Sequence, residues 1–151
     1  MLREDLSEAL KKAQKAKDTR RVSTLRLILA ALKDRDIAAR GEGRGEGLAD
    51  EEILGMLQTM IRQRRDSIKL YEQGGRLELA EQEQQEIDII QEYLPRQMDE
   101  KEIEAAVGAV MEEIGAVALK DMGRVMAALR ERHAGTMDFG KASQIAKQRL
   151  S

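Results

Sequence analysis

The chain has 151 residues, of which 42% are hydrophobic and 36% charged, so it is long enough for one ordinary domain or two small ones. It contains no cysteine and one histidine, which excludes disulfides, thiolate nucleophiles, cysteine-ligated zinc and a two-histidine metal site within one chain. Aromatic residues make up 2%, too few for a base-stacking platform. The first residues are charged, and no apolar run approaches the roughly 20 residues of a membrane span. We therefore expect a cytoplasmic protein with no membrane partner, cofactor or metal.

Apolar residues recur every three or four positions along the chain, which predicts an all-α fold. Four helices are expected in the first part of the chain, along apolar stripes at residues 2–16, 22–32, 53–68 and 80–94. Asp18 is placed to cap the second helix, and Asp50 begins an acidic first turn that suits the dipole of the third. The glycine-rich stretch 41–47 predicts a flexible loop, and glycines 74 and 75 end the third helix.

The only proline, Pro95, cannot continue a helix and biases the preceding residue away from helical angles. We place a domain boundary here, between an N-terminal four-helix domain, residues 1–94, and a C-terminal three-helix domain, residues 95–151. Asp99 and Glu102 have the spacing of a capping box that begins the second domain. Its three helices are expected along apolar stripes at residues 103–114, 122–129 and 142–150.

Charge is segregated along the chain, although the formal net charge is only -2. Residues 1–40 carry a net charge of +5, whereas residues 77–94 carry -6. In the second domain, residues 96–118 carry -4 and residues 119–151 carry +4. Such segregation can form a binding face, or it can make helices attract one another within a bundle.

No catalytic constellation is visible in the sequence. The segment Gly135–Ala142 fits G-x-x-x-x-G-K, but a phosphate-binding loop needs a hydroxyl where Ala142 stands and a β-strand before it. Asp138 would also face the phosphates, so we expect an interhelical turn. His133 has no second histidine as a partner, and we expect it to favour the dipole at a helix end.

Four stretches, residues 62–67, 75–81, 89–98 and 120–126, are followed by Gly135 and Asp138 in a pattern found in a known family. Together they resemble the GatB/YqeY family and, within it, the stand-alone YqeY-like proteins. The most specific of them is Lys-Asp-Met-Gly-Arg-Val-Met at residues 120–126, and the resemblance covers nearly the whole chain. It implies an all-helical fold whose C-terminal part is similar to the tail of the B subunit of the tRNA-dependent amidotransferase. In that enzyme the tail contacts tRNA and does not catalyse.

The resemblance, together with the basic C-terminal segment, implies a non-catalytic accessory protein that binds tRNA or another structured RNA. By analogy with the tail, Lys120 and Arg124 would contact phosphates. The full set of candidate RNA-binding residues is Lys120, Arg124, Arg130, Arg132, Lys141 and Lys147. Members of the family inherit the designation of a carbon–nitrogen ligase with glutamine as amido donor, but this chain lacks the part that performs that chemistry. The alternative is a helical adaptor that docks on a larger enzyme.

Two positions depart from the family pattern near the candidate site. Thr136 stands where a basic residue is expected, and Ala118 stands where a hydroxyl side chain often caps the following helix. The loss of such a cap would cost about 1 kcal/mol. Both changes, together with Asp121, weaken a backbone anion site at this helix start.

Overall fold

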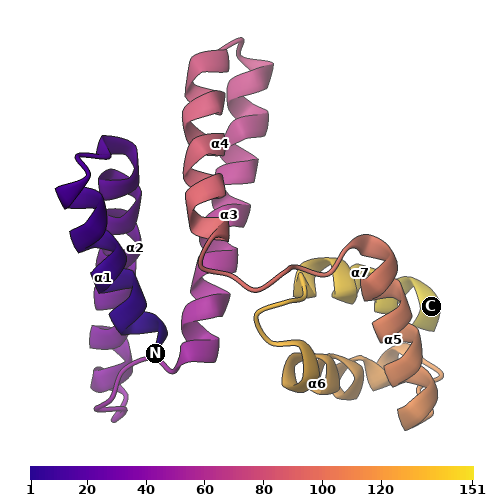
Figure 1. Ribbon diagram of the computed structural model, residues 1–151. Coiled ribbons are helices and arrows are strands. Elements are labelled where there is room, and N and C mark those ends of the chain that lie inside the picture. The colour runs from indigo at the N-terminus through magenta and orange to yellow at the C-terminus, as the bar shows by residue number, and fades with distance from the viewer. The chain divides into compact units, whose positions relative to one another are not determined.

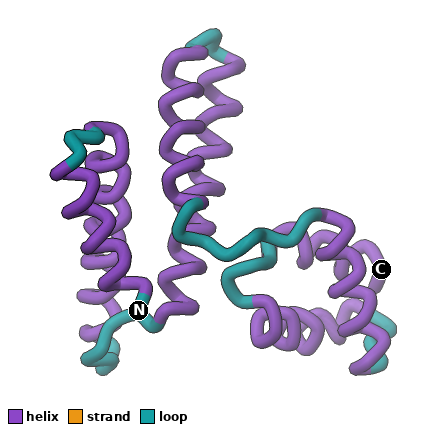
Figure 2. Tube along the Cα trace, viewed as in Figure 1, coloured by secondary structure: helices purple, strands orange, loops and turns teal.

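The computed structural model describes residues 1–151 as seven α-helices and one turn of 3-10 helix, with no strand (Figures 1 and 2). The all-α prediction is therefore confirmed. The elements in chain order are α1 (Leu2–Lys15), α2 (Thr19–Gly41), α3 (Asp50–Gln73), α4 (Leu77–Gln91), α5 (Glu100–Ile114), η1 (Leu119–Asp121), α6 (Met122–His133) and α7 (Phe139–Leu150). The chain divides into two compact units, Met1–Leu94 and Pro95–Ser151. None of the helices combines the length and apolar character needed to cross a bilayer.

The N-terminal unit consists of two helical hairpins, α1–α2 and α3–α4, which pack through contacts of α2 with α4 and of α1 with α3 (Figure 1). All four helices contribute apolar side chains to one core. The largest fully buried ones are Leu6, Leu25, Ile28, Ile53, Met56, Leu57, Ile87 and Ile90. Burial of each such side chain contributes roughly 1.5–3 kcal/mol, so the shared core holds the two hairpins together.

A buried carboxylate anchors the loop between α2 and α3 to the N-terminal helix. Asp36 is only 6% exposed, and it forms an ion pair with the guanidinium of Arg3. The backbone N–H of Leu48 donates to Asp36 Oδ1 at 2.9 Å, while Arg3 donates to the carbonyl oxygen of Leu48 at 2.8 Å. We call these three residues the Asp36 network. The Arg3 guanidinium holds the pKa of the Asp36 carboxyl below its usual range.

The helix ends of the N-terminal unit match the sequence-based expectations in part. The Asp18 side chain accepts from the backbone N–H of Arg21 at 3.2 Å, so the predicted cap of α2 is confirmed. Helix α2 continues to Gly41, beyond Leu32, the last residue of the predicted apolar stripe. Helix α4 ends at Gln91, so Leu94, the last residue of its predicted stripe, lies after the helix, in keeping with the bias that Pro95 imposes. Leu94 instead packs, half-buried, against the core.

The C-terminal unit is a bundle of α5, α6 and α7 around its own core. The fully or almost fully buried side chains are Ile103, Val107, Val110, Val125, Leu129, Met137, Ala142 and Ala146. The capping box of α5 is confirmed, since Glu102 N–H donates to Asp99 Oδ1 at 2.8 Å and Asp99 N–H donates to Glu102 Oε1 at 3.1 Å. The segment before α5 is fixed to the α6–α7 turn, because Met98 N–H donates to the Thr136 carbonyl oxygen at 2.8 Å.

Candidate nucleic-acid interface

The start of the α6 region is organised by the chain's own carboxylate. Asp121 Oδ2 accepts from the backbone N–H groups of Val117 at 2.9 Å and Ala118 at 3.2 Å. Its Oδ1 accepts from the Arg124 guanidinium at 2.8 Å. These backbone hydrogen bonds, together with Arg124, lower the pKa of Asp121 to about 2. The carboxylate therefore ties down the backbone N–H groups that precede η1 and pairs with Arg124, while Ala118 leaves η1 without a side-chain N-cap. Its negative charge at this helix start disfavours a bound phosphate.

Two arginines of α6 lie on opposite sides of that helix. Arg130 and Arg132 are two positions apart, which places them about 160° apart around the axis. The Arg132 guanidinium forms a two-point ion pair with Glu113 of α5, at 2.6 and 2.9 Å. The Arg130 guanidinium lies 5.8 Å from the ring centroid of Phe139 at the start of α7, within cation–π range. Arg132 thus faces α5, whereas Arg130 faces α7.

The cations of α7 also separate into two sides. The Arg149 guanidinium lies against Gly108 of α5, 2.6 Å from the position that a Cβ would take there. Lys147 is about 160° from Arg149 around the axis, on the side toward α6. Lys141 is about 120° from Lys147 and lies on the flank that Arg149 shares. Both lysines are exposed, and neither forms an ion pair.

Arg130 and Lys147 lie on the sides of α6 and α7 that face each other, and Lys120 belongs to η1, which contacts α7. The Arg130–Phe139 contact joins the end of α6 to the start of α7, and η1 packs against α7, so the two helices are antiparallel. Lys120 in η1 is exposed, forms no ion pair and lies toward the end of α7 that carries Lys147. We call Lys120, Arg130 and Lys147 the α6–α7 face. Arg124, Arg132 and Lys141 lie outside it.

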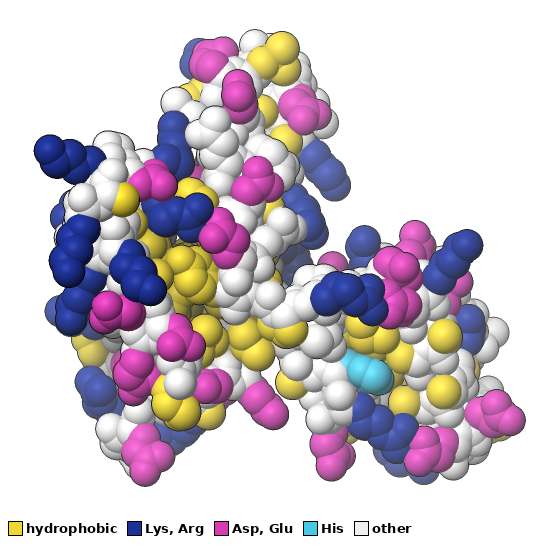
Figure 3. All heavy atoms as spheres, in the orientation of Figure 1, with side chains coloured by type: hydrophobic (Ala, Val, Ile, Leu, Met, Phe, Trp, Pro, Cys, Tyr) yellow, Lys and Arg dark blue, Asp and Glu magenta, His cyan; other side chains and the backbone are white.

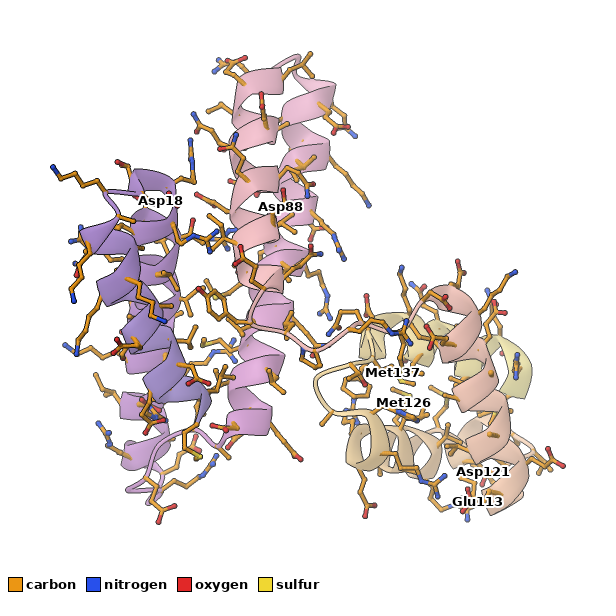
Figure 4. The ribbon with its side chains drawn as sticks, in the orientation of Figure 1. Asp18, Asp88, Glu113, Asp121, Met126 and Met137 are labelled. Carbon is orange, nitrogen blue, oxygen red and sulfur yellow. The ribbon has the colours of Figure 1, made fainter.

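The segment Gly135–Ala142, which fits G-x-x-x-x-G-K, spans the connection from α6 to α7 and the first turn of α7, and it forms no open phosphate loop. Met137 within it is fully buried in the core of the unit (Figure 4). Asp138 Oδ1 accepts from the N–H groups of Gly140 at 2.9 Å and Lys141 at 3.2 Å, which caps α7 and occupies its first donors. The expected interhelical turn is what the structure contains. No group of three or more His, Asp or Glu side chains is arranged to hold a metal ion.

Charge is also segregated on the surface. Basic side chains gather over α1 and acidic side chains lie over α4 on the face in view (Figure 3). In the C-terminal unit, the exposed acidic residues concentrate on α5, at Glu100, Glu104, Glu112 and Glu113. The α6–α7 face carries cations that no carboxylate neutralises, so it is the more positive side of that unit.

Sequence reasoning missed two contacts that shape this site. The stacking of Arg130 on Phe139 could have been suspected, because Phe139 is one of only three aromatic residues and follows the helix that carries Arg130. The approach of Arg149 to Gly108 had no local signal, because the two residues lie on different helices and meet only in the fold.

The fold and the charge distribution define a class: an all-helical protein of two units, the second of which presents exposed cations along a helix pair. The model of the Yqey-like protein family matches residues 3–150, and the chain belongs to this family.

Similar proteins are found in yeasts. A protein of Lachancea thermotolerans named Altered inheritance of mitochondria protein 41, mitochondrial, is 35% identical over 112 residues, covering 73% of this chain and 58% of that protein. A protein of the same name from Vanderwaltozyma polyspora is 33% identical over 124 residues, covering 78% of this chain and 64% of that protein. The Saccharomyces cerevisiae protein of this name is 38% identical over 86 residues, covering 56% of this chain and 44% of that protein.

The chain thus spans about half to two thirds of the length of these relatives. Each of them is named a mitochondrial protein, so the expectation of a cytoplasmic location is contradicted. Their names mention neither an enzymatic activity nor RNA.

Proposed function

We propose that this YqeY-like protein is a non-catalytic accessory that binds structured RNA of the tRNA class through the α6–α7 face of its C-terminal unit. The observation that carries the proposal is the presence of three exposed or stacked cations, Lys120, Arg130 and Lys147, on neighbouring elements with no carboxylate paired to them. Cations without an intramolecular partner can exchange bound counterions for phosphates, which is the main source of affinity in RNA binding.

The arginines that already pair with carboxylates are less suited to phosphate binding, which also favours the α6–α7 face. Arg132 already holds Glu113 at 2.6 Å, and Arg124 holds Asp121 at 2.8 Å. A phosphate would have to compete with these carboxylates, so each arginine contributes less to binding than an unpaired lysine. Arg124 and Arg132 are therefore expected to be secondary contacts, and Lys141, on the other flank of α7, a peripheral one.

Electrostatics would also orient the RNA. Residues 119–151 carry a net charge of +4, whereas residues 96–118, which include α5, carry -4. A polyanion approaching the unit is attracted to α6 and α7 and repelled by α5, so one side of the bundle is favoured. The similarity of this unit to the tRNA-contacting tail of the amidotransferase B subunit points to the same class of ligand.

The experiment is a titration of fluorescently labelled tRNA transcript with the full chain across a salt series. The test variant is Lys120→Glu/Lys147→Glu, and the matched control is Lys11→Glu/Lys15→Glu on α1, which makes the same charge change at exposed, unpaired positions. We expect the test variant to bind at least about tenfold more weakly, with a log–log salt slope smaller by about two units, because two phosphate contacts are lost. Equal weakening by the control pair would show that only net charge matters, and would refute the site.

A helical protein–protein adaptor is the second candidate. It is favoured by the charge segregation of the N-terminal unit, where residues 1–40 carry +5 and residues 77–94 carry -6. Complementary patches of this kind steer protein association. Recovery of a stoichiometric protein partner that survives RNase treatment supports the adaptor, and recovery of RNA alone argues against it.

A further inference from the structure

Helix α2 carries apolar residues on two opposite sides. Its inner side places Leu25, Ile28 and Leu32 in the core of the N-terminal unit. Its outer side leaves Leu27 46% exposed and Ile37 55% exposed. Two helix positions that differ by ten lie about 80° apart around the axis, so both large side chains fall within one stripe.

Small residues complete this stripe, which we call the outer stripe of α2. It consists of Leu27, Ala30, Asp34, Ile37 and Ala38, all of them exposed. From Leu27 to Ala38 it extends over three turns, about 16 Å. Ala30 lies between Leu27 and Ile37, and Ala38 lies beside Ile37. Their small side chains leave room for the ridge of another helix to pack between the larger ones. Asp34 is the only charged residue within the stripe.

A row of cations borders the outer stripe on one side. Arg26, Lys33 and Arg40 follow at seven-residue intervals, which keeps them on one side of α2 at steps of about 10 Å. All three are exposed, and none of them forms an ion pair. Arg40 makes only a 3.4 Å hydrogen bond to the Gly45 carbonyl oxygen. On the other border, Arg35 is likewise exposed and unpaired.

We propose that the outer stripe of α2 docks an amphipathic helix of another protein, with an apolar face bordered by Asp and Glu. The apolar side chains of the partner would cover Leu27 and Ile37, and its carboxylates would face Arg26, Lys33 and Arg40. Complementary charges along the borders of a helix pair set partner choice and orientation. The surface lies in the N-terminal unit and does not rest on RNA binding; it would give the adaptor alternative a docking site.

Charge selects this occupant over the others. A second copy would bring its own basic borders against those of α2 in either direction, and like charges face to face are destabilising. An anionic membrane would have to accept the Asp34 carboxylate in the middle of the inserted stripe, with only two large apolar side chains to hold it. Nucleic acid would gain nothing from Leu27 and Ile37. An acidic amphipathic helix uses both the stripe and its borders.

The test uses two synthetic helical probes of about 21 residues, with Leu at the a and d positions of three heptads. One probe carries Glu at the e and g positions, and the other carries Lys there. Each is titrated, at concentrations where it is monomeric, into the full isotope-labelled chain, and the amide signals of the chain are followed by NMR. We expect the acidic probe to bind with a Kd on the order of 10–100 µM, as a small interface allows, and to shift the signals of α2. The basic probe should leave these signals in place.

Two variants test whether the acidic probe binds at the outer stripe of α2, and a third variant is the control. Leu27→Ser/Ile37→Ser should weaken binding of the acidic probe about tenfold or more, because it removes both anchors. Arg26→Glu/Lys33→Glu should reverse the preference, so that the basic probe binds. The control, Leu70→Ser/Leu77→Ser, alters two leucines of the same unit that are 68% and 66% exposed at the α3–α4 turn, and should change nothing.

Three results would overturn the proposal. The first is an equal response to the acidic and basic probes, or an acidic-probe affinity that charge reversal leaves unchanged. The second is binding to vesicles of phosphatidylcholine and phosphatidylserine with loss of the α2 signals, while neither probe shifts them; that result would make the stripe a membrane surface. The third is a dimer of the chain in sedimentation analysis that Leu27→Ser/Ile37→Ser dissociates.

Discussion

Replacement of Gly47 by alanine is expected to destabilise the N-terminal unit by about 2–3 kcal/mol more than the same replacement at Gly43, because only Gly47 adjoins a buried charged network. Both glycines have a positive φ, 76° at Gly47 and 90° at Gly43, so alanine meets a similar backbone penalty at each. At Gly43 the new Cβ has no neighbour within 4 Å. At Gly47 it would overlap Asp36 Oδ1 and lie 2.8 Å from Asp36 Cγ.

The magnitude follows from what the displaced carboxylate holds. Asp36 Oδ1 accepts the Leu48 N–H at 2.9 Å, and the carboxylate forms the ion pair with Arg3. A hydrogen bond to a charged group contributes about 1.5–3 kcal/mol, and we count little more than one of them because the Arg3 side chain is 33% exposed to screening solvent. The backbone penalty, about 1–2 kcal/mol, is common to both variants and cancels in the comparison.

The assay is urea unfolding followed by tyrosine emission. Tyr71 and Tyr93 are the only tyrosines, and both lie in Met1–Leu94, so this signal reports the N-terminal unit. In an Asp36→Ala background, Gly47→Ala should cost no more than Gly43→Ala, since the overlapping carboxylate is absent. Equal destabilisation by the two glycine variants in the wild-type background would refute the reasoning.

Two further predictions concern the C-terminal unit. Asp121 has a pKa lowered to about 2, so its charged form stabilises the fold fully above about pH 4, and this contribution is lost as the pH falls from 4 toward 2. Asp121→Asn should make the free energy of unfolding depend less on pH between 4 and 2, as measured by amide hydrogen exchange in α6. An unchanged pH dependence in this variant would contradict a stabilising role of the Asp121 carboxylate. Leu129 is fully buried, so Leu129→Ala should lower the free energy of unfolding of the C-terminal unit by about 2–5 kcal/mol. The native amide signals of α5, α6 and α7 would then disappear at a lower urea concentration than in the wild type. A decrease below about 1 kcal/mol would argue against the burial of Leu129 in the core.

Much of the fold follows from local sequence. The three- and four-residue apolar spacing predicts the helices, and the caps at Asp18 and Asp99 are local hydrogen bonds that the sequence spells out. The apolar repeat does not reveal the full length of α2, because Asp36 occupies the inner side of the helix after Leu32 and interrupts the repeat. Its burial is explained by Arg3 and the Leu48 N–H, both of which are remote in sequence.

Two core positions outside the helices also depend on tertiary contacts. Pro95 biases Leu94 away from helical angles, and Leu94 continues the apolar stripe because it packs on the core from beyond the end of α4. Met137 is fully buried although it lies in an interhelical connection, where no periodicity marks it as core.

The candidate site was less accessible from sequence than the fold. Composition counts the cations of residues 119–151 but cannot say which of them meet a carboxylate. The Arg132–Glu113 pair joins residues that are 19 positions apart on different helices, so it exists only once the bundle forms. The separation of Arg130 from Arg132 follows from helical geometry, but the helix that each one faces depends on how α6 packs.

Binding of structured RNA is tested most directly by titrating tRNA transcript with the unaltered full chain at about 150 mM salt. We expect saturable binding with a micromolar Kd and a slope of log K against log salt that corresponds to about three phosphate contacts, one for each cation of the α6–α7 face. Binding that appears only at low salt, or that equals the binding of an unstructured RNA of the same length, would contradict it.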